Sequence, residues 1–156
     1  MSDQNKKVGA GFGVMIMKDR KVLLGKRHID PEKADSLLNG AATWTMPGGK
    51  MEFGETFEDA AKRETKEETD IDLEDVQVMC VNNERIDSAH FVTIGLYSEK
   101  FKGDPGVMEP DEITEWRWFE LDDLPSPVYF PSKEIIENYK QGKFYISENN
   151  FINKHI

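Results

Sequence analysis

The order of apolar and polar positions predicts paired strands at the start of the chain. Val8–Met17 is rich in apolar and β-branched residues, and Val22–Lys26 follows it after the polar turn Lys18–Lys21. Such a pattern predicts a β-hairpin. Ile29–Gly40 is polar, with a proline and an Asn-Gly pair, and predicts a loop. Thr43–Met46 predicts a short extended segment.

The clearest helix predicted is Glu55–Thr69. Thr56 can cap its start, and Asp59 stands three residues on, as in a capping box with Asp in place of Glu. Asp70 follows it, and Asp tolerates the left-handed conformation that ends many helices. Ser132–Gln141 predicts a second helix, with apolar residues on one side and a glycine after its end.

Three further segments predict strands, namely Val76–Asn83, Phe91–Phe101 and Glu115–Glu120. Apolar and polar residues alternate only partly in the first two, so their ends are poorly defined. Strands around two helices favour an α/β fold, with a mixed sheet between helical layers. Since no repeat or linker interrupts the chain, we expect a single domain over residues 1–156.

Composition narrows the classes of function. The net charge of −10, from 30 acidic and 20 basic residues, disfavours duplex nucleic acid as a partner. It leaves room for a phosphorylated ligand, because carboxylates that hold Mg²⁺ accept polyphosphate. One cysteine, Cys80, excludes an internal disulfide framework. No secretory signal or membrane-length apolar run is present, so we expect a cytoplasmic protein with no membrane partner.

Three acids within the first predicted helix are candidates for metal binding. Glu64, Glu67 and Glu68 stand at positions i, i+3 and i+4, which places them on one face. Their mutual repulsion favours a bound cation, and all-oxygen ligands suit Mg²⁺ or Mn²⁺. The same spacing is also typical of a solvated helix face, since Lys62 and Lys66 alternate with the acids.

A glycine pair upstream favours the metal site. Gly48 and Gly49 allow close backbone approach to a ligand. From Gly49 to Ile71 the chain resembles the Nudix box: Gly, five residues, Glu, seven residues, Arg-Glu, an aliphatic residue, any residue, Glu-Glu, any residue, Gly, and an aliphatic residue. Thr65 and Asp70 depart from the aliphatic and glycine positions. Every acidic position is filled, which argues against an inactive member.

The resemblance implies an α/β/α sandwich with a mixed sheet, and hydrolysis of nucleoside diphosphates linked to another moiety. It implies Mg²⁺ as cofactor, with Mn²⁺ as a possible substitute. The residues implied in catalysis are Glu55, Arg63, Glu64 and Glu68. The implied metal ligands are the Gly49 carbonyl, Glu64, Glu67 and Glu68. An acid outside the box often assists, as a metal ligand or as a base, and Glu112 is the candidate, with Glu109 in reserve. The alternative for Glu112 is a surface-loop acid.

The resemblance also indicates a substrate class. Residues 22–27, 43–49 and 52–56 resemble MutT-like nucleoside triphosphate diphosphatases. His90–Ile94 and the Tyr129-Phe130 pair resemble one branch of them, whose members form homodimers and remove pyrophosphate from nucleoside triphosphates.

Six residues are candidates for nucleotide contacts: Arg27, Thr45, Gly48, Thr93, Tyr129 and Phe130. Arg27 can bind phosphate through two donors, although a surface cation is the alternative. The aromatic pair can stack on a base, or pack in the core. The two threonines can reach a base edge, but strand threonines are common without such a role.

Three functions remain open at this point. The favoured one is hydrolysis of nucleoside triphosphates to a monophosphate and pyrophosphate. The second is hydrolysis of a nucleotide sugar, ADP-ribose or a dinucleotide. Family members that act on ADP-ribose often carry a proline about sixteen residues after the box, and residues 85–89 contain none. The third is a non-catalytic nucleotide-sensing module.

Overall fold

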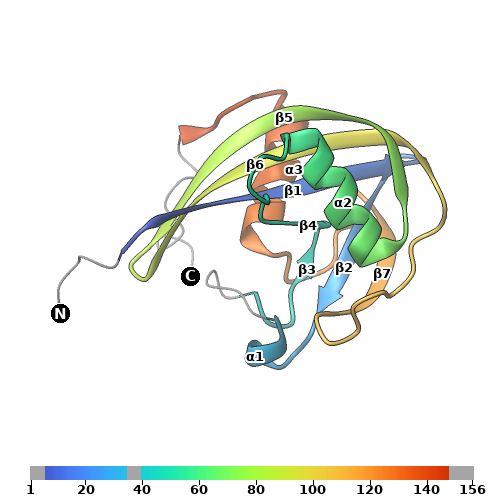
Figure 1. The fold of residues 1–156 in the computed structure, drawn as a ribbon, viewed down its shortest axis with the longest axis horizontal. Coiled ribbons are helices and arrows are strands. Elements are labelled where there is room, and N and C mark those ends of the chain that lie inside the picture. Colours follow the sequence, from blue (N-terminus) through green and yellow to red (C-terminus); the bar gives the residue numbers. More distant parts are fainter. Residues whose placement is uncertain (1–5, 35–39, 148–156) are drawn as a thin grey trace.

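The computed structural model describes residues 6–34 and 40–147, so residues 35–39 of the predicted loop lie outside it. Figure 1 shows strands in the centre with helices on both sides. The strands are β1 (Val8–Lys18), β2 (Lys21–Arg27), β3 (Trp44–Thr45), β4 (Gly48–Gly49), β5 (Asp72–Ile86), β6 (Ala89–Lys102) and β7 (Ile113–Glu120). The helices are α1 (Pro31–Ala34), α2 (Phe57–Thr69) and α3 (Phe130–Gln141).

One seven-stranded sheet has the order β3-β2-β1-β6-β5, with β4 paired to β1 and β7 paired to β2. Strands β1 and β6 run parallel, and the other pairs are antiparallel. The predicted mixed sheet and the predicted hairpin of β1 and β2 are therefore confirmed.

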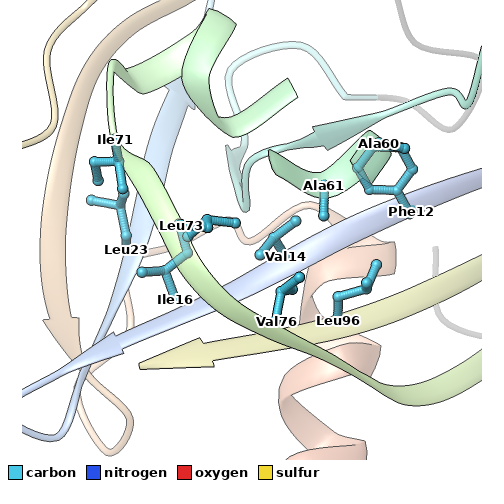
Figure 2. Packing of buried hydrophobic residues seen from close by; sticks show 10 residues of the cluster. All are labelled: Phe12, Val14, Ile16, Leu23, Ala60, Ala61, Ile71, Leu73, Val76 and Leu96. Carbon is cyan, nitrogen blue, oxygen red and sulfur yellow. The ribbon is translucent and has the colours of Figure 1, made fainter. Parts of the chain in front are cut away.

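Alternate residues of β1 enter two separate cores. Phe12, Val14 and Ile16 enter one core, in which Phe12 and Val14 lie beside two alanines of α2, as Figure 2 shows. Met15 and Met17 pack on the opposite side, against isoleucines of α3. A strand buried on both faces reads as a nearly continuous apolar run, which is the pattern of β1. The two helices thus cover opposite faces of the sheet, and the predicted α/β/α sandwich is confirmed.

The predicted loop Ile29–Gly40 was wrong at one point, because Pro31–Ala34 forms the short helix α1. Two local signals explain this turn. Proline is favoured at the first helical position, where its missing N–H is not needed. The carboxylate of Asp30 also accepts a hydrogen bond from the backbone N–H of Glu32, at 3.0 Å.

The predicted strand Val76–Asn83 was too short at both ends. Strand β5 runs from Asp72 to Ile86, and its pairing with β6 has three register irregularities. Such irregularities change which residues face the core, so the alternation in the sequence is interrupted. This explains why apolar periodicity missed the ends of the strand.

Candidate active site

Helix α2, which carries the acids beside β4, is capped at both of its ends. The hydroxyl of Thr56 accepts a hydrogen bond from the backbone N–H of Asp59, at 3.0 Å. At the other end Asp70 adopts the left-handed conformation, with φ of 66°, and its N–H donates to the Lys66 carbonyl. Both caps were predicted from the sequence, and they set where the helix begins and ends.

Arg63 joins the acidic residues of the site into one hydrogen-bonded cluster. It donates to both carboxylate oxygens of Glu55, from Nε at 2.8 Å and from Nη2 at 3.0 Å. Its Nη1 donates to Glu64 at 3.0 Å and to Glu67 at 3.3 Å, and its Nη2 donates to the Lys50 carbonyl at 3.1 Å. Because of these bonds the pKa of Arg63 is raised and the pKa of Glu55 is lowered.

Two glycines bring the backbone of β4 against α2. A side chain at Gly48 would overlap the carbonyl oxygen of Phe12. A Cβ at Gly49 would lie 2.9 Å from the carboxyl carbon of Glu64, closer than real Cβ contacts allow. The N–H of Gly48 also points to the carboxylate of Glu68, at 3.4 Å. The absence of side chains therefore lets the Gly48–Gly49 backbone meet the acids directly.

Glu64 and Glu68 raise the electrostatic energy of the site. Burial raises the pKa of both carboxyls, and the charge of Glu64 raises the pKa of Glu68 further. Hydrogen bonds oppose these shifts, from Arg63 to Glu64 and from the Gly48 N–H to Glu68. Because ionising two adjacent carboxyl groups is costly, a nearby positive charge would stabilise their ionised forms.

A second chain segment brings more acid to the cluster. The charges of Glu112, Glu64 and Glu67 add to burial in raising the pKa of Glu109, and Glu109 in turn acts on Glu68. Glu112 lines the adjacent cavity. The sequence favoured Glu112 over Glu109 as the helper acid, whereas the structure places Glu109 in electrostatic contact with the box acids.

The residues present have the chemistry of a divalent-cation site. Within residues 6–34 and 40–147, no three Asp, Glu, His or Cys side chains stand in positions to hold one ion together. The reason is visible in the cluster, where Arg63 holds the carboxylates of Glu64 and Glu67. The Glu67 side chain is 51% exposed and can rotate. Carboxylates and a backbone carbonyl match the oxygen ligands that Mg²⁺ prefers, so the donor set fits this cation after side-chain rotation.

A cavity of about 420 Å³ begins at the acid cluster and extends between β1, β6 and the start of α3. Its wall near the cluster contains Gly48, Gly49, Lys50, Glu68 and Glu112. The rest of the wall is formed by Gly11, Phe12, Gly13, Arg27, Thr45, Met46, Phe91, Thr93, Ile113, Tyr129, Pro131, Ser132 and Ile135. Carboxylates and apolar surface thus share one cavity, as expected of a ligand site.

The structure brings most of the predicted substrate residues to this cavity. Arg27 and Tyr129 meet there, with the guanidinium carbon 5.0 Å from the ring centroid. Thr93 and Thr45 also line it, but the hydroxyl of Thr45 lies 3.2 Å from that of Ser132. Phe130 is the first residue of α3 and is not among the lining residues.

Sequence reasoning missed several residues of the site. Ser132 accepts a hydrogen bond from the Met46 N–H, at 3.0 Å, and so fixes the start of α3 against the cavity wall. Phe91 adds an aromatic face next to Thr93. Two buried acids behind the wall, Glu84 and Glu134, were also missed. Glu84 follows directly after the predicted strand Val76–Asn83, and Glu134 lies within the predicted helix Ser132–Gln141, so the sequence marked neither as buried.

Comparisons with known proteins place this geometry in context. The sequence profile of the NUDIX domain matches residues 7–139. An ADP-ribose pyrophosphatase from Methanocaldococcus jannaschii is 31% identical over 131 residues, which cover 83% of this chain and 71% of the relative. An oxidized purine nucleoside triphosphate hydrolase from Mus musculus is 31% identical over 134 residues, which cover 76% of this chain and 70% of the relative.

Solved structures share the arrangement of strands and helices. A MutT NUDIX hydrolase from Burkholderia pseudomallei aligns with a TM-score of 0.74 at 34% identity, over 85% of this chain and 98% of that one. No helix in the described ranges has both the length and the apolar character needed to cross a bilayer.

Proposed function

Since the chain belongs to the NUDIX family, we propose that it hydrolyses nucleoside triphosphates, modified ones included, to a nucleoside monophosphate and pyrophosphate. The family match and the relatives show a MutT-like pyrophosphohydrolase that acts on nucleotide derivatives. The triphosphate as substrate and Mg²⁺ as cofactor are our proposal and go beyond what the family match and the relatives establish.

The observation that carries the proposal is the single cavity shared by acids and a wall suited to a nucleoside. Glu68 and the Gly48–Gly49 backbone lie at one part of its wall, and Phe91 and Thr93 lie at another. A nucleotide bound along this cavity places its phosphates at the acids and its base on the aromatic and hydroxyl groups. Arg27, held over the ring of Tyr129, can donate to a phosphate oxygen from two nitrogens.

The acids of the box would hold Mg²⁺, or Mn²⁺ as a substitute, through the Gly49 carbonyl and the carboxylates of Glu64, Glu67 and Glu68. We assign the additional acid to Glu112 or Glu109. When bound, the cation supplies positive charge that activates water and stabilises the charge that develops on the phosphates.

Within the chain, Glu55 and Arg63 orient the box by two hydrogen bonds, which fix the Arg63 guanidinium beside Glu64. Glu64 and Glu68 are the carboxylates that can accept the proton of the attacking water. Their crowding at the Gly48–Gly49 backbone keeps them within reach of a phosphate bound there.

A second candidate substrate is a compound in which a nucleoside diphosphate is linked to another group, such as ADP-ribose. The 31% identity to a protein named ADP-ribose pyrophosphatase favours it. The relative named for oxidized purine triphosphates has the same identity, so substrate choice must be measured. The complete set of acids argues against a purely nucleotide-sensing role.

The proposed assembly follows the resemblance noted above. We propose a cytoplasmic homodimer that does not bind duplex nucleic acid. The excess of acidic over basic residues supports the last of these points, because it opposes binding to phosphate backbones. Sedimentation equilibrium measures the mass in solution, and a monomer at all concentrations would refute the dimer.

The direct test is incubation with Mg²⁺ and a panel of normal and modified nucleoside triphosphates, ADP-ribose and nucleotide sugars. We expect monophosphate and pyrophosphate as products, and their loss in Glu67→Gln. The matched control is Glu58→Gln, which removes a carboxylate from the first turn of the same helix. Turnover only of the diphosphate-linked compounds would move the assignment to the second candidate. Binding without turnover would favour the sensing module.

A further inference from the structure

Two buried acids face each other behind the nucleotide cavity. Glu84 of β5 is 0% exposed and Glu134 of α3 is 3% exposed. Among the residues that the structure describes, none of their four carboxylate oxygens has a hydrogen-bond partner of normal geometry. Burying such groups without partners is costly, so their presence requires a physical reason.

The neighbouring polar pair shows how β5 and α3 meet. Asn82 donates to the side-chain oxygen of Asn138, at 2.8 Å. From Asn82 to Glu84 is two strand residues, about 6.7 Å, and from Asn138 back to Glu134 is about 6 Å along the helix. The two spacings match, so Glu84 lies opposite Glu134. The charge of Glu84 accordingly adds to burial in raising the pKa of Glu134.

Thr93 connects the buried pair Glu84 and Glu134 to the cavity. In the pairing of β5 with β6, Glu84 is opposite Phe91 and Asn82 is opposite Thr93. Glu84 and Thr93 are therefore diagonal neighbours on one face, within reach of a long side chain. Interaction with the Thr93 hydroxyl lowers the pKa of Glu84, against the larger effect of burial. Phe91 and Thr93 both line the cavity.

Thr93 also stands at a suitable distance from the acids. It pairs with Gly11 of β1, and the next residue of β1, Phe12, pairs with Gly49 of β4. Two strand spacings, about 10 Å, thus separate Thr93 from Gly49. With phosphates at Gly49, a nucleobase reaches the neighbourhood of Thr93.

We propose that Glu84 is a positioning residue for base specificity: its carboxyl sets the direction of the Thr93 hydroxyl, and thereby whether the cavity wall donates a hydrogen bond to a nucleobase or accepts one. The inference deepens the proposed function, because it requires that the cavity binds a nucleotide.

The two protonation states of Glu84 give opposite hydroxyl directions. When protonated, its O–H donates to the Thr93 oxygen, so the Thr93 hydrogen turns to the cavity and can donate to an oxo group. When ionised, it accepts from Thr93, whose lone pairs then face the cavity and can accept from an amino group. Burial raises the pKa of Glu84 to about 7, so both states are populated near neutral pH.

The groups around Glu84 leave it as the one that titrates near neutrality. In the described part of the chain, Glu134 of α3 and Cys80 of β5 are the titratable groups that interact with it by charge. Burial raises the pKa of Glu134 to about 9 and that of Cys80 to about 12, so both stay neutral at pH 7. The side chains of β6 on this face, Phe91 and Thr93, do not titrate in this range.

The test compares inosine with adenosine nucleotides, which carry an oxo and an amino group at the same ring position. The ratio of kcat/KM for the two triphosphates is measured between about pH 6 and about pH 8.5. The ratio of Kd for the two monophosphates is measured in parallel, because it tests the inference without turnover. We expect the preference for inosine to fall about fivefold as pH rises, the effect of one neutral hydrogen bond.

Three variants locate the cause. Glu84→Gln cannot ionise, so its ratios should not change with pH. Thr93→Val removes the hydroxyl and should likewise abolish the change. Glu134→Gln, at a similarly buried neighbour whose pKa of about 9 keeps it mostly protonated over this range, should keep the change of wild type. Melting temperatures establish that each variant is folded.

The outcomes separate the two proposals. Loss of turnover of both triphosphates with a pH-dependent Kd ratio, abolished in Glu84→Gln, would overturn the proposed function and support the role of Glu84. A ratio that does not change with pH in wild type, or that changes equally in Glu84→Gln, would overturn the role of Glu84 and leave the function standing. Absence of both turnover and binding would overturn both.

Discussion

Arg63 donates two hydrogen bonds to the carboxylate of Glu55, one from Nε at 2.8 Å and one from Nη2 at 3.0 Å. Both oxygens of the Glu55 carboxylate thus hold the planar guanidinium, and the third guanidinium nitrogen, Nη1, donates a hydrogen bond to Glu64. Since the two residues are eight positions apart, the pair ties the loop before α2 to the middle of that helix. The geometry of the acid cluster therefore depends on this contact.

The first prediction concerns that contact. Arg63→Lys keeps the charge but cannot make two parallel hydrogen bonds to Glu55. We expect kcat to fall about a hundredfold, because small displacements of catalytic groups have effects of that size. Steady-state kinetics on the preferred substrate measure this loss. Lys62→Ala, at the exposed neighbouring position, is the control, and an unchanged kcat in Arg63→Lys would contradict the orienting role.

The second prediction concerns the close approach of β4 to β1. Gly48→Ala places a methyl group against the Phe12 carbonyl, which cannot move without breaking the sheet. We expect the free energy of unfolding to fall by about 1–3 kcal/mol. Urea denaturation measures it. Gly106→Ala is the control, since its added methyl would lie 3.9 Å from the nearest atom. Equal losses in the two variants would show that the contact is not responsible.

The third prediction uses the buried acid Glu134, whose pKa is raised from 4.5 to about 9. The folded protein holds this proton more tightly than the unfolded chain, so its contribution to stability is complete below pH 4.5 and declines as pH rises toward 9. Glu134→Gln removes this decline. We expect the change in unfolding free energy between about pH 5 and about pH 8 to shrink by about 4 kcal/mol.

Denaturation at the two pH values provides the measurement for Glu134. Glu137→Gln removes a partly exposed carboxyl from the same helix and should leave the pH dependence as in wild type. If Glu134→Gln and Glu137→Gln behave alike, the Glu134 carboxyl ionises in the folded protein as readily as in the unfolded chain.

The fourth prediction concerns phosphate binding by Arg27. Arg27→Lys keeps a positive charge but loses the planar donor pair and its contact with the Tyr129 ring. We expect KM to rise about tenfold with kcat within about twofold, because the contact binds substrate and transition state alike. Lys26→Arg, the adjacent position, should change neither constant. A fall in kcat at constant KM would instead assign Arg27 to the chemical step.

Much of the acid site could be predicted from sequence because it is local. Glu64, Glu67 and Glu68 share a helix face through the 3.6-residue period, which operates within one element. The caps at Thr56 and Asp70 depend on backbone groups at most four residues away. No knowledge of the rest of the fold was needed for these features.

Other parts of the site depended on contacts between distant segments. The hydroxyl of Thr45 meets that of Ser132, 87 residues later, so a residue expected to read a base also contacts the protein itself. Glu109 interacts with the box acids only because its loop returns to α2. No pattern within either segment specifies these meetings.

The sequence by itself determined the family, both caps of α2 and the order of the acids along that helix. Only the tertiary structure decided that Glu84 of β5 lies opposite Glu134 of α3, beside a threonine that lines the cavity. The physical reason is the range of the interactions. Helical period and capping act over a few residues, whereas the burial of a carboxyl depends on which strand and which helix pack together.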